Sequence, residues 1–127
     1  MPRKVLAAIS VLSVLVGATT ACSGSASVSA GFEGGPGMLY FYSPHCPVCQ
    51  GMKPIMDDLE SEYGGDFKFV WVNVDTNRGK QRARAQGLIG QPAYLIFDDS
   101  GEEVRRLMGA HSRTMLQQAI EQSMAGE

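Results

Sequence analysis

Two cysteines separated by two residues, Cys46 and Cys49, are the side chains of this sequence best suited to chemistry. They follow an apolar and aromatic stretch, residues 38–43, and precede a segment with helical periodicity, so they fall where a strand ends and a helix begins. A helix N-terminus carries free N–H groups and partial positive charge, which favour a thiolate over a thiol. When the pair is open, one sulfur can attack a partner and the other can resolve the mixed disulfide. The spacing therefore indicates a dithiol redox motif.

The elements that must hold this pair can be predicted from the pattern of apolar residues. Four apolar or β-branched stretches predict strands, of which the last alternates apolar and charged residues as an edge strand does. Apolar residues at helical spacing predict a long helix after the pair and a final helix that Ser112 is placed to cap. The predicted strands are 38–43, 67–74, 93–97 and 102–108, and the helical apolar residues are Met52, Ile55, Met56, Leu59 and Tyr63, then Met115, Leu116, Ala119, Ile120 and Met124. With a basic helix between the second and third strands, the order predicts an α/β fold.

Further residues at matching spacings make residues 38 to 125 resemble the thioredoxin superfamily. Pro54 follows the second cysteine by five residues, where that family has a kinking proline, and Gly90-Gln91-Pro92 stands before a strand, where it has a cis-proline. Gly101 and Gly109 lie around the last hairpin. The resemblance implies a thioredoxin-like fold with about four strands in a mixed sheet, flanked by about three helices.

The same resemblance assigns roles to the site residues. It implies that Cys46 is the exposed nucleophile, Cys49 the buried resolving thiol, and Pro92 a cis residue that faces the pair. A cis bond is inexpensive only before proline, and a proline without an N–H leaves the backbone of Gln91 free to pair with an extended peptide. A trans proline that starts an edge strand is the alternative for Pro92.

The chain departs from the family pattern at several positions. The family has Trp before the first cysteine and Gly-Pro between the two, where this chain has His45 and Pro47-Val48. The family's buried Asp and Lys, which handle the proton of the second thiol, fall at Tyr40 and Trp71, and neither can do that work. The first strand and helix are missing, which predicts a domain shortened at its N-terminus.

His45 has two interpretations. Its imidazolium would stabilise the Cys46 thiolate and so make the pair a better oxidant. It is equally compatible with an exposed loop residue that has no fixed partner.

The N-terminal segment predicts export. Arg3 and Lys4 precede an uncharged apolar run, residues 5–18, that is too short to span a bilayer and resembles a secretory signal. Thr19 to Cys22 then resemble a bacterial lipoprotein signal, which implies that Cys22 is lipidated, although Thr19 replaces the usual aliphatic residue. The alternatives are cleavage after Ala21 or Ala30, an uncleaved anchor, or a core helix.

This organisation divides the chain into three parts. Residues 1–21 are the predicted signal peptide, and 22–37 are the lipidated cysteine and a linker of Ser, Gly, Ala and Pro, whose composition predicts flexibility. Residues 38–127 are the predicted domain. In a cell with two membranes, Ser23 after the cysteine favours the outer membrane, since the Asp that signals inner-membrane retention is absent.

Composition and charge exclude some classes of function. The chain has 127 residues, with 11 basic and 13 acidic side chains and a formal charge of −2, so no nucleic-acid partner is expected. Three cysteines are too few for a disulfide scaffold. Four cations on the predicted basic helix form either a solvated face or a docking patch for an acidic partner: Arg78, Lys80, Arg82 and Arg84.

We therefore expect a membrane-tethered, extracytoplasmic thiol–disulfide oxidoreductase, active as a monomer and without a dissociable cofactor. Its partners would be cysteine-containing protein substrates and a redox partner protein, with Gln91 and Pro92 presenting the substrate backbone. It would face the periplasm or the exterior, and a soluble periplasmic or secreted form is the alternative. A competing hypothesis is a Cu or Zn module that uses Cys46, Cys49 and either His45 or His111. A domain that only binds proteins is a third.

Overall fold

The computed structural model describes residues 35–126 as one four-stranded sheet with three helices. The strands lie in the order β2-β1-β3-β4. The elements are β1 (Gly37–Tyr42), α1 (Pro47–Tyr63), β2 (Lys68–Asn73), α2 (Asn77–Ala85), β3 (Ala93–Phe97), β4 (Glu103–Met108) and α3 (Arg113–Ala125). The predicted strands, helices and mixed sheet are confirmed, with strand ends shifted by at most one residue.

Connection lengths explain the pairing of the strands. β1 and β2 are parallel, with Tyr42 opposite Asn73, and α1 supplies the long crossover that a parallel pair needs. β3 runs antiparallel to β1 and pairs antiparallel with β4 through a tight turn. In that turn the Asp98 carboxylate accepts from the N–H of Ser100 at 2.9 Å and Glu102 at 3.0 Å, while Gly101 adopts φ 81°. As predicted, β4 forms an edge of the sheet.

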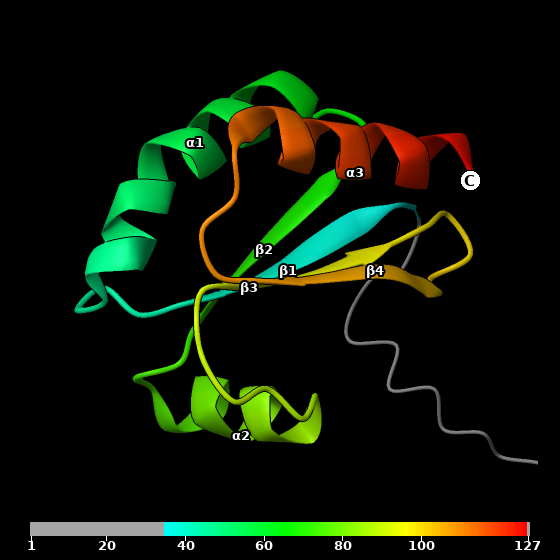
Figure 1. Ribbon diagram of the computed structural model, residues 1–127. Coiled ribbons are helices and arrows are strands. Elements are labelled where there is room, and N and C mark those ends of the chain that lie inside the picture. The colour runs from blue at the N-terminus through cyan, green and yellow to red at the C-terminus, as the bar shows by residue number, and fades with distance from the viewer. Residues whose placement is uncertain (1–34, 127) are drawn as a thin grey trace, which may run out of the picture.

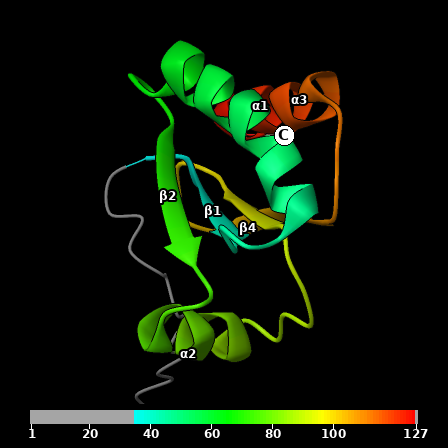
Figure 2. The same cartoon turned by 90° about the vertical axis from the view of Figure 1, so that its left-hand side faces the viewer.

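The helices cover the two faces of the sheet unequally. In Figure 1, α1 and α3 lie above the sheet and α2 alone lies below it, and Figure 2 shows the same layers from the side. Successive residues of a strand point to opposite faces, so β1 and β3 contribute to both cores. The core under α1 and α3 includes Met38, Tyr40, Met52, Met56, Leu59, Phe67, Tyr94, Ile96, Leu116 and Ile120. The core facing α2 contains Leu39, Phe41, Val72, Ala93, Leu95 and Phe97.

Local capping sets where α2 and α3 begin. Ser112 caps α3 as predicted, since its Oγ accepts from the Met115 N–H at 3.2 Å. Thr76 caps α2 by accepting from the Gly79 N–H at 3.0 Å. Gly79 also permits a close approach, because a Cβ there would lie 1.8 Å from the carbonyl oxygen of Asn73. This contact requires glycine at position 79.

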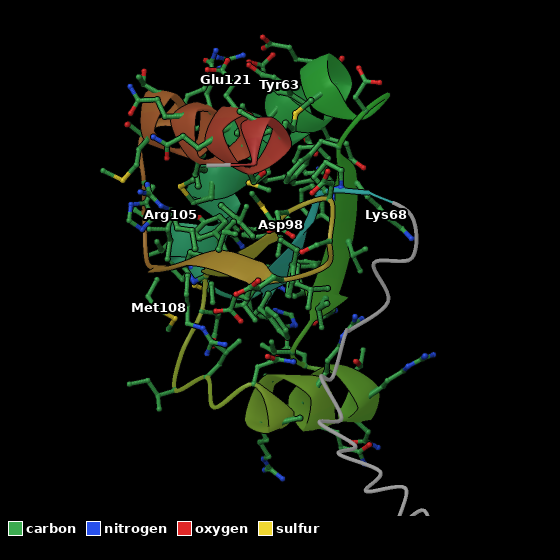
Figure 3. All side chains as sticks on the ribbon, turned by 90° about the vertical axis from the view of Figure 1, so that its right-hand side faces the viewer. Tyr63, Lys68, Asp98, Arg105, Met108 and Glu121 are labelled. Atoms are coloured by element: carbon green, nitrogen blue, oxygen red, sulfur yellow. The ribbon has the colours of Figure 1, made fainter. Side chains whose placement is uncertain are left out.

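Polar contacts join α1 to α3 on the outer surface. Tyr63 donates to Glu121 at 2.6 Å, and Figure 3 shows the two side chains together where the helices meet. Arg113 of α3 binds Asp58 at 2.8 Å and also binds Glu62. These contacts fix α3 against the helix that begins at the cysteine pair.

The predicted signal peptide, Cys22 and nearly all of the linker lie outside the described residues. None of the helices within residues 35–126 is long and apolar enough to cross a membrane.

Candidate active site

The cysteine pair sits at the first turn of α1, on the side of the molecule where β1 ends (Figure 1). Cys46 is the N-cap residue, with extended backbone angles, and Pro47 occupies the first turn of the helix. The Cys46 Sγ accepts a hydrogen bond from the Cys49 N–H at 3.4 Å, so the sulfur takes the place of a capping oxygen. Both cysteines are free thiols. Pro54 lies inside α1, as predicted.

The two thiols differ in their readiness to ionise. Cys46 is partly exposed, and its pKa is lowered by the hydrogen bond from the Cys49 backbone and by the Cys49 thiol. Cys49 is only 3% exposed, and burial raises its pKa to about 11. Deprotonation therefore begins at Cys46, while Cys49 stays protonated at neutral pH.

The loop between β1 and α1 is held by a pair that the sequence did not predict. Ser43 is buried, and its hydroxyl donates to Asp75 Oδ2 at 2.8 Å and accepts from the His45 N–H at 3.1 Å. The Ser43 carbonyl accepts from the Cys46 N–H at 3.2 Å. Because parallel strands end at the same edge of a sheet, polar residues just after β1 and just after β2 could have indicated this contact. The bonds fix the backbone that enters Cys46.

Pro92 lies on the neighbouring strand end. The Gln91–Pro92 peptide bond is cis, which agrees with the family resemblance, and Pro92 is buried. Phe41 pairs with Ala93, so Pro92 stands at the end of β3 that adjoins the carboxyl end of β1. The Pro92 carbonyl accepts from the Gly109 N–H at 2.8 Å. Gln91 is exposed, and no hydrogen bond between described residues involves its backbone.

The other predicted site residues are on the surface. His45 and Pro47 are exposed, and Val48 is 47% exposed. Within residues 35–126, the His45 imidazole has no hydrogen bond or ion pair. Its predicted influence on the Cys46 thiolate stays a prediction.

Cys49 is one of the residues that line an aromatic cavity of about 420 Å³. Tyr40 and Trp71 stand opposite each other in register, with ring centroids 5.0 Å apart at 86°. The Trp71 indole donates to Glu60 Oε2 at 2.8 Å, and Lys53 Nζ lies 5.5 Å from the Trp71 ring centroid. The lining comprises Tyr40, Tyr42, Ser43, Pro44, Cys49, Gln50, Lys53, Asp57, Glu60 and Trp71. The cavity that Tyr40 and Trp71 help to line was not predicted from the sequence.

The described residues give the metal hypothesis no support. Within residues 35–126, no group of three or more His, Cys, Asp or Glu side chains is placed to hold a metal ion. His111, one of the two candidate ligands, has its Nδ1 3.1 Å from the Met115 sulfur and its Nε2 3.0 Å from the Met108 carbonyl. Its ring packs against Tyr94 with centroids 5.8 Å apart.

Comparison with known proteins agrees with this architecture. The family described as Thioredoxin matches residues 27–122. A thiol:disulfide interchange protein TxlA homologue from Synechocystis sp. is 31% identical over 75% of this chain, and the match spans 53% of that relative, about half its length. Thioredoxin 1 from Nostoc sp. is 33% identical over 70% of this chain and 80% of its own.

A solved structure extends the similarity to three dimensions. Oxidised mitochondrial thioredoxin 3 from Saccharomyces cerevisiae superimposes with a TM-score of 0.61 at 25% identity, covering 70% of this chain and 79% of that one. The family match covers most of the chain. The sheet order and the cis peptide bond before Pro92 are observed separately, in the structure of this chain. This chain belongs to the thioredoxin family.

Proposed function

We propose that this protein is a thiol–disulfide oxidoreductase that exchanges disulfides with cysteine-containing proteins through Cys46 and Cys49. The observation that carries the proposal is the asymmetry of the pair: one accessible thiol with a lowered pKa, and one buried thiol with a raised pKa, on the same helical turn. Such a pair supplies an attacking thiolate and a reserve thiol for the second step. The names of relatives, such as thiol:disulfide interchange protein and thioredoxin, support this class of activity.

In the reducing direction, the Cys46 thiolate attacks one sulfur of a substrate disulfide. A Cys46–substrate disulfide forms, and the other substrate sulfur leaves as a thiolate and takes up a proton. Cys49 then loses its proton and attacks the Cys46 sulfur, which releases the second substrate thiol and leaves a Cys46–Cys49 disulfide. Two electrons pass from the pair to the substrate, and the reverse sequence oxidises it.

Substrate docking is assigned to the surface beside the pair. Gln91 is exposed at the cis bond with its backbone groups unused among described residues, so an extended peptide can pair with it. Pro47 and Val48 offer an exposed apolar contact next to the reacting sulfur, and His45 borders it. Buried Pro92 shapes this surface by holding Gln91 at the end of β3.

The test of the function replaces Cys46 by Ser in the full chain. We expect Cys46→Ser to abolish the reduction of insulin disulfides by dithiothreitol above the uncatalysed rate. Cys22→Ser, which lies outside the described domain, is the matched control and retains activity in a soluble assay. Equal activity of wild type and Cys46→Ser would exclude the proposal.

The proposed location is the cell envelope, with the protein attached as a monomer through a lipid on Cys22. The basic start, the apolar run and the small residues before Cys22 support this location. Mass spectrometry of the mature N-terminus tests it directly. An acylated N-terminal Cys22 is expected, whereas a free Cys22 thiol or an N-terminus after Ala30 would contradict the anchor.

A further inference from the structure

Helix α2 is the most basic element of the domain. Its four cations are Arg78, Lys80, Arg82 and Arg84, and residues 76–97 contain no acidic side chain. On α1, β4 and α3, one cation of each element binds a carboxylate. On α2, Arg78, Lys80 and Arg84 are exposed, and within residues 35–126 none of these three has an ion pair. Their charges are therefore available to a partner outside the chain.

Two of the four cations lie on one side of α2 and line one pocket. Residues four apart share a side of a helix, so Arg78 groups with Arg82, and Lys80 groups with Arg84. Arg78 and Arg82 line a pocket of about 250 Å³ together with Trp71 and polar residues around the start of α2, whereas Lys80 and Arg84 do not. Burial and the nearby charge of Arg78 lower the pKa of Arg82. The pocket thus holds two positive charges close together, an arrangement that an anion would stabilise.

This pocket borders the candidate active site. Because β1 and β2 are parallel, the loop into α2 and the loop into Cys46 leave the sheet at the same edge, as Figure 1 shows. The Ser43 hydroxyl joins the two loops directly by donating to Asp75 at 2.8 Å, and Arg78 follows three residues after that carboxylate. Trp71 lines both the pocket and the aromatic cavity of the active site. The pocket and the cavity therefore meet at Trp71.

The order of the strands places the pocket across the site from the cis-proline. In the order β2-β1-β3, the loop that follows β1 lies between the start of α2 on one side and Gln91 and Pro92 on the other. A substrate that pairs with the Gln91 backbone and reacts at Cys46 can therefore continue towards the start of α2. A side chain that reaches Arg78 from this direction meets positive charge and no carboxylate of the helix.

We propose that the pocket of Arg78 and Arg82 binds a carboxylate side chain of the substrate protein, so that cysteines with an acidic residue nearby are preferred. The inference rests on the proposed function and deepens it by naming a class of substrate. A guanidinium group suits this role because it can bind a carboxylate through two parallel hydrogen bonds. An ion pair at the rim of an interface acts mainly on the rate of association and weakens as salt is added.

The test measures how fast Cys46 captures short peptides whose single cysteine is joined to thionitrobenzoate. The protein is full length and carries Cys22→Ser and Cys49→Ser, so that Cys46 is its only thiol. The Cys46 thiolate bonds to the peptide sulfur, the bond from that sulfur to thionitrobenzoate breaks, and the released thionitrobenzoate thiolate is followed by its absorbance. Matched peptides carry Glu, Gln or Lys at one position within four residues of the cysteine. Rates with 2-mercaptoethanol correct for the intrinsic reactivity of each peptide.

At the best position, we expect the Glu peptide to react about three- to fivefold faster than the Gln peptide, which is the effect of one exposed ion pair. This ratio should fall towards one in 1 M sodium chloride, where the Debye length is about 3 Å. Arg78→Gln should abolish the preference, and Arg78→Glu should make the Lys peptide the fastest of its set. Arg84→Gln removes the same charge from the other side of α2 and should keep the preference. Rates with the Gln peptide should stay within about twofold in every variant, which shows that the fold is intact.

Equal rates for the Glu and Gln peptides would overturn the inference and leave α2 with a solvated face, as would an equal loss of preference in Arg78→Gln and Arg84→Gln. Equal rates combined with Arg78-dependent binding to phosphatidylglycerol vesicles would assign the face to anionic lipid instead. The capture assay is independent of insulin reduction, because it requires only an accessible Cys46 thiol. A preference for Glu without insulin reduction would reject the proposed function and keep the carboxylate pocket, and the opposite pattern would do the reverse.

Discussion

The two faces of the sheet use the same strands for different purposes. Towards α1 and α3, the strands present tyrosines and a tryptophan around the buried Cys49 and a cavity. Towards α2, they present a core cluster of aliphatic side chains, alanine and phenylalanine. Because neighbouring residues on a strand point to opposite faces, Tyr40 belongs to the first face and Phe41 to the second. Both faces stabilise the sheet by packing, and the face towards α1 and α3 also carries the cysteine and tyrosine groups that ionise.

The largest expected effect is on the face that only packs. Phe41 is fully buried, so Phe41→Ala should lower the free energy of unfolding by about 3 to 5 kcal/mol through lost burial and a cavity. Urea denaturation of the oxidised and reduced proteins should give the same loss, since no ionisable group is involved. Tyr40→Phe, one residue away, should leave stability at neutral pH unchanged or slightly higher, because it removes an unpaired hydroxyl. A greater loss in Tyr40→Phe than in Phe41→Ala would break the comparison.

The next largest loss of stability should come from substitutions at the close approach of α2 to the end of β2. Gly79→Ala places a Cβ against the Asn73 carbonyl oxygen and should destabilise the protein by about 1 to 3 kcal/mol, measured by urea denaturation. Gly51→Ala is the matched control, because Gly51 lies in α1 and a Cβ at this position would meet no atom within 4 Å. That change should stabilise the helix by about 0.5 to 1 kcal/mol. Effects of the same sign at the two glycines would contradict the close approach at Gly79.

The smallest expected effect is a pH dependence of the stability of the reduced protein, which only the face towards α1 should produce. Cys49 has its pKa raised to about 11, so between its ordinary value and pH 11 the unfolded chain loses this proton while the folded protein keeps it. Stability of the reduced protein should therefore fall as pH rises through that range. The lowered pKa of Cys46 has the opposite effect at lower pH. Stability rises with pH there, because the Cys46 thiol ionises at a lower pH in the folded protein than in the unfolded chain.

Thermal unfolding of the reduced and oxidised proteins across pH 7 to 11 measures this difference. The disulfide form lacks both titrations, so subtraction of the two profiles isolates the thiols. Phe41→Ala should lower both profiles without altering their difference. A difference profile that is flat above pH 9 would contradict the burial of Cys49 as the cause of its raised pKa.

The fold could be predicted from the sequence because its signals are local. The periodicity of Met52 to Tyr63 reports a helix, Ser112 is a local cap, and Asp98 to Gly101 form a turn from adjacent residues. The cysteine spacing, together with its place between a strand and a helix, was enough to predict a candidate site. The cis bond before Pro92 agrees with an expectation taken from the family resemblance.

Other features of the site needed the tertiary structure because they join residues distant in sequence. Ser43 and Asp75 are 32 positions apart, and Trp71 and Glu60 are 11 apart on different elements. Periodicity tells which face a side chain is on, but strand register decides its partner. The sequence thus determined the cysteine pair, its helix and the order of elements. Only the packed sheet decided that Cys49 is buried beside a cavity that Tyr40 also lines, since burial, and the pKa that follows from it, depends on what the other strands bring alongside.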